Sequence, residues 1–125
     1  RKVMGKSQRT KGSSGERELF SQLSAELGIT INRNLSQTRG GGCDTEDIPN
    51  FSLECKRCET YNFNSWWQQT LDQVADGRKP VLFYRKSRRA WRAMFLLSDV
   101  CSDFSGSDTV DVSFETACLI IRESL

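Results

Sequence analysis

The sequence predicts an α/β fold in which a central mixed β-sheet is flanked by helices. Three observations lead to this class. Apolar residues recur at helical spacing near the N-terminus, they alternate with polar residues in the middle of the chain, and two short apolar runs follow a second helical segment. A chain of 125 residues without an internal repeat fits one compact domain. We expect residues 1–12 to form a flexible basic arm and residues 13–125 to form the single folded domain.

The first predicted helix begins at Ser13 or Ser14, since either is a good N-cap, and Gly28 closes it. Its apolar stripe is centred on the direction of Glu16, whereas Glu18 points about 200° away, toward water. The stripe consists of Leu19, Phe20, Leu23 and Leu27. An inward carboxylate costs free energy unless it is paired or binds a metal, so Glu16 is a candidate site residue. The alternative is an acid that only favours the helix dipole in the first turn.

A strand is expected over residues 29–34, followed by a turn at the glycine run of residues 40–42. Asp44 comes two residues after this run, just before or at the start of the next strand. From there its side chain could reach back over the strand that follows.

That strand, residues 51–56, alternates apolar and polar side chains with the period of a half-buried strand. Glu54 and Lys56 therefore share one face, roughly 6.5 to 7 Å apart. A carboxylate and an ammonium at this spacing can reach one phosphate, the first through a metal and the second directly. The alternative is a solvated strand face without function.

A second helix is predicted over residues 64–77, with Gly77 as its C-cap. One stripe of this helix carries Trp67, Leu71 and Val74. Trp66 lies beside the stripe, where it is either exposed for stacking on nucleic acid or part of the core.

Two further strands are expected over residues 81–84 and 92–97. Residues 102–108, rich in Ser, Asp and Gly, form a loop. Residues 109–114 alternate as an edge strand, and residues 116–124 are expected to form a terminal helix.

The net charge of +2 conceals a strong segregation of charge along the chain. Residues 1–12 hold five basic residues and no acid, and residues 78–92 hold seven and no acid, while residues 93–125 hold six acids and one Arg. Two basic segments favour contact with a polyanion. A solubilising tail and an ordinary solvated hairpin are the alternatives for residues 1–12 and 85–89.

Several functional classes are excluded by what the sequence lacks. Without histidine, the chain cannot use His-metal nuclease chemistry, a Ser-His-Asp triad or a histidine general base. No phosphate-binding loop motif and no apolar run near 18 residues appear, so we expect no nucleotide cofactor, no membrane contact and a cytoplasmic location. Five irregularly spaced cysteines fit reduced thiols, although Cys55 and Cys58 have the spacing of half a zinc site.

The combination of these motifs resembles a known superfamily. Residues 11–18, Lys-Gly-Ser-Ser-Gly-Glu-Arg-Glu, followed by an Asp and then by Glu-Cys-Lys-Arg at residues 54–57, are similar to the PD-(D/E)xK nucleases. Within that superfamily the chain resembles the archaeal-type Holliday junction resolvases and related small phage endonucleases, over residues 11–97. The resemblance implies a restriction-endonuclease-like core.

The same resemblance implies roles for four residues. Glu16, Asp44 and Glu54 would be catalytic metal-binding acids, and Lys56 the catalytic lysine. The family has Pro-Asp-Ile at the first acid of the strand, whereas here no Pro precedes Asp44 and the residue followed by Ile is Asp47. We favour Asp44, because it leaves ten residues for a hairpin before Glu54 and Asp47 leaves seven, but both stay open.

The resemblance also turns the basic segments into DNA contacts. The expected DNA-binding residues are Lys6, Arg9, Lys11, Arg39, Arg57, Arg85, Lys86, Arg88 and Arg89. In such nucleases the helix after the active strand offers polar residues near the site, and Gln69 and Gln73 are the candidates here.

Our hypothesis from the sequence is a DNA endonuclease that uses Mg²⁺, with Mn²⁺ as a substitute, because hard carboxylate oxygens select these ions. The expected substrate is branched DNA, with a Holliday junction cut by a homodimer. Two alternatives remain: a nicking or restriction-type nuclease for ordinary duplex, and a non-catalytic DNA-binding protein on a nuclease fold.

Overall fold

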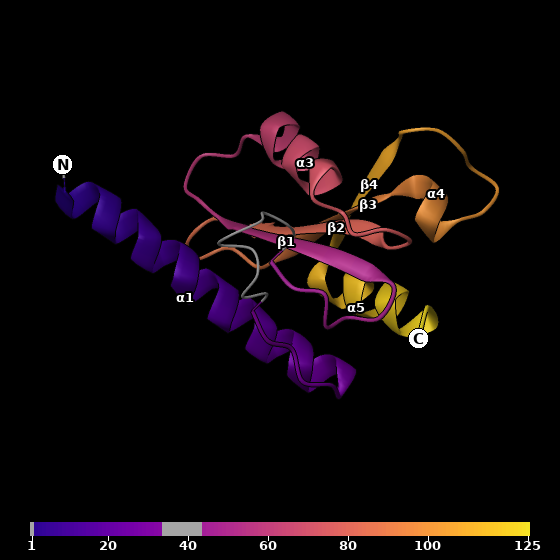
Figure 1. The fold of residues 1–125 in the computed structure, drawn as a ribbon, viewed down its shortest axis with the longest axis horizontal. Coiled ribbons are helices and arrows are strands. Elements are labelled where there is room, and N and C mark those ends of the chain that lie inside the picture. Colours follow the sequence, from indigo (N-terminus) through magenta and orange to yellow (C-terminus); the bar gives the residue numbers. More distant parts are fainter. Residues whose placement is uncertain (1, 34–43) are drawn as a thin grey trace.

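The computed structural model describes residues 2–33 and 44–125, and their side chains from residue 14 onward. The described part contains four helices and four strands, in the order shown in Figure 1. The elements are α1 (Lys2–Leu27), β1 (Phe51–Arg57), α3 (Phe63–Asp72), β2 (Lys79–Arg85), β3 (Arg92–Leu96), α4 (Leu97–Val100), β4 (Thr109–Ser113) and α5 (Phe114–Glu123).

The strands form one mixed sheet in the order β1-β2-β3-β4. β1 and β2 are parallel, with α3 in the connection between them, and the two following pairs are antiparallel. This arrangement confirms the predicted α/β class with a mixed sheet. Among the described strands, β1 and β4 lie at the two edges, so one long side of β1 is not covered by another strand of the sheet.

Helices cover both faces of the sheet. α1 and α5 lie on one face and α3 on the other (Figure 1). The main core, under α1 and α5, includes Leu19 and Leu23 from α1, Leu53 from β1, Phe83 from β2 and Ile121 from α5. A smaller core under α3 joins Trp66 to Leu82 and Tyr84. The two faces of β1 therefore belong to two different layers, which matters for the site below.

Local signals explain two of the helix ends. Gly28 ends α1 with a φ of +70° and donates from its backbone N to Ser24 O at 2.9 Å, as predicted for a glycine C-cap. Ser113 caps α5, because its hydroxyl accepts a hydrogen bond of 3.2 Å from the backbone N of Thr116.

The N-terminal helix is longer than expected. α1 starts at Lys2, so Ser13 and Ser14 lie inside it rather than at its N-cap. Residues 2–12, which the sequence indicated as a flexible arm, are therefore helical. Long unbranched Lys, Arg, Gln and Met side chains in this segment favour a helix, and the cap signal alone did not outweigh them.

The strand predicted over residues 29–34 is absent from its described part, residues 29–33. Side chains satisfy the backbone there instead: Ile31 N donates to Ser24 Oγ at 3.2 Å, and Asn32 N donates to Asp47 Oδ2 at 2.7 Å. Ile31 itself is buried in the main core. The apolar pattern of residues 29–33 therefore reflects the burial of Ile31 and not a strand.

The second helix is shorter than predicted and turned differently. α3 ends at Asp72 with Gln73 as C-cap, and Gly77 belongs to a later turn with a φ of +77°. Its fully buried residues are Trp66 and Thr70 rather than the stripe around Trp67. Of the two possibilities for Trp66, a place in the core is confirmed and exposure for stacking is wrong, since it packs on Leu82 and Tyr84. The short α4 had no signal strong enough to be predicted.

No helix in the described part of the chain is long and apolar enough to span a membrane.

Candidate active site

Asp44 lies along the uncovered edge of β1. Its backbone N donates to Leu53 O at 2.9 Å, and Leu53 N donates to Thr45 O at 3.2 Å, so a short antiparallel bridge continues the sheet here. The side chain turns back onto the strand, where Asp44 Oδ2 accepts a hydrogen bond of 2.7 Å from Cys55 N. Asp44 is 5% exposed. The strand edge thus fixes this carboxylate next to the backbone that follows Glu54.

Glu54 and Lys56 project from β1 on the face covered by α3. Parallel pairing places Glu54 beside Leu82 of β2. The same register places Lys56 beside Tyr84, and both β2 residues belong to the core under α3. The predicted shared face is confirmed. Glu54 is almost fully buried, whereas Lys56 is half-buried.

Glu16 approaches the same edge from the other layer. It lies on α1, where its neighbour Gly15 packs so closely on β1 that a Cβ would lie 3.0 Å from Arg57 Cβ. The Glu16 side chain is 17% exposed and points inward, as its position on the helix predicted. Its carboxylate interacts with Asp44 through a side-chain hydrogen bond and lies within electrostatic reach of Lys56. The edge of β1 thus brings together groups from three segments of the chain.

The protonation behaviour of these acids reflects their crowding. Burial, followed by the charge of Asp44, raises the pKa of Glu54 to about 8, against the lowering effect of Lys56. Burial and then Asp44 also raise the pKa of Glu16 to about 7, against the lowering effect of Arg33. Two of three neighbouring carboxyl groups therefore resist ionisation. The positive charges of Lys56 and Arg33 do not offset the mutual repulsion and the burial of these three acids.

A divalent cation would supply that charge. The donors are hard carboxylate oxygens, which suit Mg²⁺, an ion that binds through one or two carboxylates and keeps several waters. Asp44 and Glu54 are the buried pair that could hold it, and Glu16 lies next to Asp44. No group of three or more Asp, Glu, Cys or His side chains is close enough to form a ready metal cage within the described residues. The chemistry of the donors fits Mg²⁺ with water completing its shell.

Asp47 occupies a different place from Asp44. It is exposed, and its Oδ2 accepts the hydrogen bond from Asn32 N that orders the segment after α1. The charge of Asp44 raises the pKa of both Glu16 and Glu54, whereas Asp47 is bonded to the segment after α1. The geometry therefore brings Asp44, and not Asp47, to the other acids.

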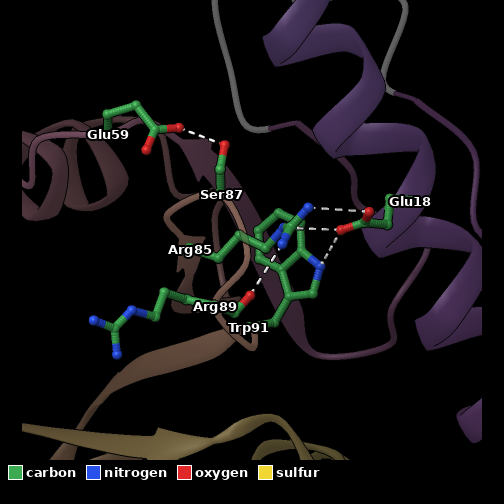
Figure 2. Close-up of polar contacts among 6 residues, drawn as sticks. All are labelled: Glu18, Glu59, Arg85, Ser87, Arg89 and Trp91. Carbon is green, nitrogen blue, oxygen red and sulfur yellow. Dashed lines mark hydrogen bonds and ion pairs between the residues drawn. The ribbon is translucent and has the colours of Figure 1, made fainter.

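Glu18 and Arg85 differ from expectation. Glu18 was predicted to face water, and Arg85 to bind DNA. Instead Arg85 Nη2 donates to Glu18 Oε2 at 3.2 Å, and Trp91 Nε1 donates to Glu18 Oε1 at 2.8 Å (Figure 2). Arg85 Nε also lies 2.9 Å from Glu18 Oε1 and forms an ion pair with it. This Nε makes no hydrogen bond with any described residue. The Arg85 side chain is only 12% exposed and pairs with α1, and its contact with DNA stays a prediction.

The other predicted DNA contacts divide into three groups. Arg57 is half-buried beneath Gly15, and its Nε is buried without a hydrogen-bond partner among the described residues. Arg88 and Arg89 are exposed in the turn after β2, while Lys86 is half-buried with its Nζ 4.6 Å from the centre of the Tyr61 ring. Arg39 and the side chains of Lys6, Arg9 and Lys11 lie outside the described residues.

Two grooves border these groups. One, of about 520 Å³, runs from Glu16 along α1 to Arg33. The other, of about 450 Å³, is lined by Tyr61, Lys86 and Arg89. Of the candidate helix residues, Gln69 lies in the last turn of α3 and Gln73 is its C-cap, and α3 packs on β1 and β2.

Arg33 is a site residue that sequence reasoning missed. Its Nε lies 3.4 Å from Glu16 Oε1, and its side chain is 51% exposed. The signal was present, because Arg33 is the sole charged residue of the segment 28–38. It was overlooked because that segment was expected to be a strand rather than a chain that returns past α1.

Comparison with protein families gives one match that covers most of the chain. A family model described as "Phage putative PDDEXK endonuclease" matches residues 7–120. Comparison with the curated proteins and with the solved structures gives no match. The mixed four-stranded sheet flanked by helices is the architecture that the resemblance implied, an α/β restriction-endonuclease-like fold.

Proposed function

Since the chain belongs to this family of phage PDDEXK endonucleases, we propose that it is a Mg²⁺-dependent endonuclease that hydrolyses phosphodiester bonds in branched DNA. One observation carries the proposal: Glu16, Asp44, Glu54 and Lys56 converge on one edge of the sheet although they come from three separate segments. Three acids and a lysine, without histidine, can carry out metal-assisted phosphodiester hydrolysis.

In this proposal Asp44 and Glu54, with Glu16, would hold Mg²⁺, which when bound lowers the pKa of water and stabilises charge on the phosphate. Asp44 is held in place by the N–H of Cys55, so it cannot turn away from the cluster without losing that bond. Lys56 directs a positive charge to the same place and would stabilise the negative charge that develops on the phosphate oxygens. Arg33, half-exposed beside Glu16, is suited to contact the neighbouring phosphate.

The exposed turn after β2 is the second part of the proposed DNA surface. β1 and β2 are parallel, so the turn follows the same end of the sheet as Lys56 and Arg57. Lys86 and Arg89 line the groove of about 450 Å³ there. Figure 2 shows the Arg89 guanidinium pointing away from Glu18, and Arg88 is also exposed. These three cations would contact the DNA backbone beyond the cleaved bond.

A four-way junction cut by a homodimer is the finer form of the proposal. It rests on the resemblance to junction resolvases, and a two-fold dimer would offer one site for each of two symmetric strands. Mn²⁺ should replace Mg²⁺, since both prefer oxygen ligands. The cytoplasmic location stays a prediction.

A substrate panel tests the proposal. Four-way junction, flap, nicked and linear duplex DNA of matched sequence would be incubated with the protein and Mg²⁺, Mn²⁺ or EDTA, and the products mapped on both strands. Metal-dependent cuts placed symmetrically at the junction, with slow cutting of linear duplex, are expected. Equal cutting of all substrates would exclude a preference for junctions and would indicate a nuclease that acts on ordinary duplex DNA. Binding without cleavage in either metal would overturn the nuclease proposal.

A further inference from the structure

A cluster of Glu18, Arg85 and Trp91 joins α1 to the turn after β2 that carries Lys86, Arg88 and Arg89. Glu18 accepts from both partners, at 3.2 Å from Arg85 Nη2 and 2.8 Å from Trp91 Nε1. The Arg85 guanidinium carbon also lies 5.5 Å from the centre of the Trp91 ring. Trp91 is 4% exposed. One carboxylate thus accepts hydrogen bonds from a guanidinium and an indole in a partly enclosed place.

This cluster lies close to Glu16 along α1 and can therefore affect the position of Glu16. Glu18 is two residues further along α1 and points to the opposite side of the helix, about 200° away. Glu16 is therefore on a segment held from two sides: Gly15 rests on Arg57 of β1, and Glu18 is bound by β2 and by the residue before β3. Rotation or sliding of α1 would break the Glu18 contacts before it moved Glu16 far.

The same guanidinium also orders the basic turn. Arg85 Nη1 donates to Arg89 O at 3.0 Å (Figure 2). Arg89 N donates to Lys86 O at 3.1 Å, so the turn closes on Arg85. At its far side Ser87 Oγ donates to Glu59 Oε2. Arg85 therefore holds the turn through the Arg89 carbonyl and holds α1 through Glu18.

We propose that Glu18 is a positioning residue, which through Arg85 and Trp91 holds the Glu16 segment of α1 in a fixed relation to β1 and to the basic turn. The inference rests on the proposed function, because it assigns Glu18 a task in presenting Glu16. Glu18 does not touch substrate or metal in this account. Its loss should misplace Glu16, and a displacement of about 1 Å at a reacting group can cost about 100-fold in rate.

The chain offers a matched control for the test. Glu26, on the same helix, pairs with Arg122 at 3.5 Å, with side chains 54% and 46% exposed. Glu18→Ala and Glu26→Ala each remove one carboxylate from α1 and one ion pair to another element. Glu18→Gln adds a conservative variant, since its amide oxygen can still accept from Trp91 Nε1 while the charge opposite Arg85 is lost.

Three measurements on the full chain decide the matter: hydrogen exchange of α1 amides, Mn²⁺ binding by calorimetry without DNA, and single-turnover cleavage at saturating DNA. We expect Glu18→Ala to speed exchange around residue 16, weaken Mn²⁺ binding several-fold and slow cleavage about 10-fold, with Glu18→Gln in between and Glu26→Ala within about two-fold of wild type. If Glu18→Ala matches Glu26→Ala in exchange and in Mn²⁺ binding, the positioning role is overturned.

The outcome for the wild-type protein separates this inference from the proposed function. Wild type that neither binds Mn²⁺ nor cleaves DNA would refute the nuclease, and the exchange measurement would then still show whether Glu18 holds α1. Unchanged exchange in folded Glu18→Ala overturns the inference in that case too. A lower melting temperature with unchanged metal affinity and unchanged rate per folded molecule would indicate a purely structural role and also contradict it.

Discussion

Asp44 Oδ2 lies 2.7 Å from the backbone N of Cys55 and accepts its hydrogen bond. This bond fastens one acid to the strand at the position directly after a second acid, Glu54. The separation of the two carboxylates is therefore set by backbone pairing along the edge of β1, since Asp44 N also donates to Leu53 O. A preorganised pair of this kind is what a metal-dependent site needs.

Asp44 and Asp47 can be separated by matched substitutions. Asn at position 44 keeps an oxygen that can accept from Cys55 N but removes the charge, so Asp44→Asn should fold and lose at least about 100-fold in cleavage rate. Asp47→Asn keeps an acceptor for Asn32 N and should cleave within a few-fold of wild type. Single-turnover rates with Mg²⁺ provide the comparison. Strong loss in Asp47→Asn with activity retained in Asp44→Asn would reverse the assignment.

The raised pKa values predict a pH-dependent stability for the metal-free protein. Glu54 has a pKa of about 8 in the folded state against an ordinary 4.5, and Glu16 one of about 7. Below 4.5 both states hold these protons, and above it the unfolded state loses them first, so stability falls as pH rises from 4.5 to about 8. Melting temperatures in EDTA should drop by several degrees between about pH 5 and pH 8.5.

Two controls accompany the pH experiment. Glu54→Gln should show a smaller drop in melting temperature, because the group that titrates is gone. Mg²⁺ should raise the melting temperature of wild type mainly at the higher pH, where the carboxylates are ionised. A drop of the same size in Glu54→Gln would show that other groups cause it.

The basic turn after β2 should act on DNA affinity rather than on chemistry. Lys86→Ala and Arg89→Ala should each weaken binding and lower the slope of log affinity against log salt by about one, while cleavage at saturating DNA changes little. Arg122→Ala, on α5, is the control, because that side chain faces Glu26. Fluorescence anisotropy over a salt series in EDTA measures the slopes. An unchanged slope in both variants would exclude this turn from the DNA surface.

Gly15 should be needed for the close approach of α1 to β1. In an open helix Gly→Ala stabilises by about 1 kcal/mol. Here the added Cβ would lie 3.0 Å from Arg57 Cβ and 3.2 Å from Cδ, so α1 must move outward and carry Glu16 with it. We expect Gly15→Ala to melt no higher than wild type and to cleave about 10-fold more slowly. A more stable variant with the wild-type rate would contradict this packing.

Sequence patterns were reliable where one physical cause dominated. The phase of β1 follows from alternation, so Glu54 and Lys56 were correctly placed on one face, and helical geometry correctly turned Glu16 inward. Sequence patterns were unreliable where contacts with distant parts of the chain determine the position of a side chain. Glu18 was expected in water because helix phase carries no information about a neighbouring Arg85.

The same limit explains the segment after α1 and the choice between two acids. Residues 29–33 look like a strand, yet the edge of β1 is taken by Asp44 and Thr45, so their backbone bonds to side chains instead. Which Asp reaches Glu54 depends on that bridge, whose partner Leu53 lies eight residues from Thr45. Spacing favoured Asp44, but the pairing could not be read from it.

The most direct measurement compares Mg²⁺-dependent cleavage of a four-way junction by wild type, Glu54→Gln and Lys56→Ala, under single turnover with saturating protein and with DNA binding measured in EDTA. We expect metal-dependent cleavage by wild type and a loss of at least about 100-fold in both variants, with DNA affinity within a few-fold of wild type. Cleavage by either variant at the wild-type rate would contradict the assignment of this cluster as the active site.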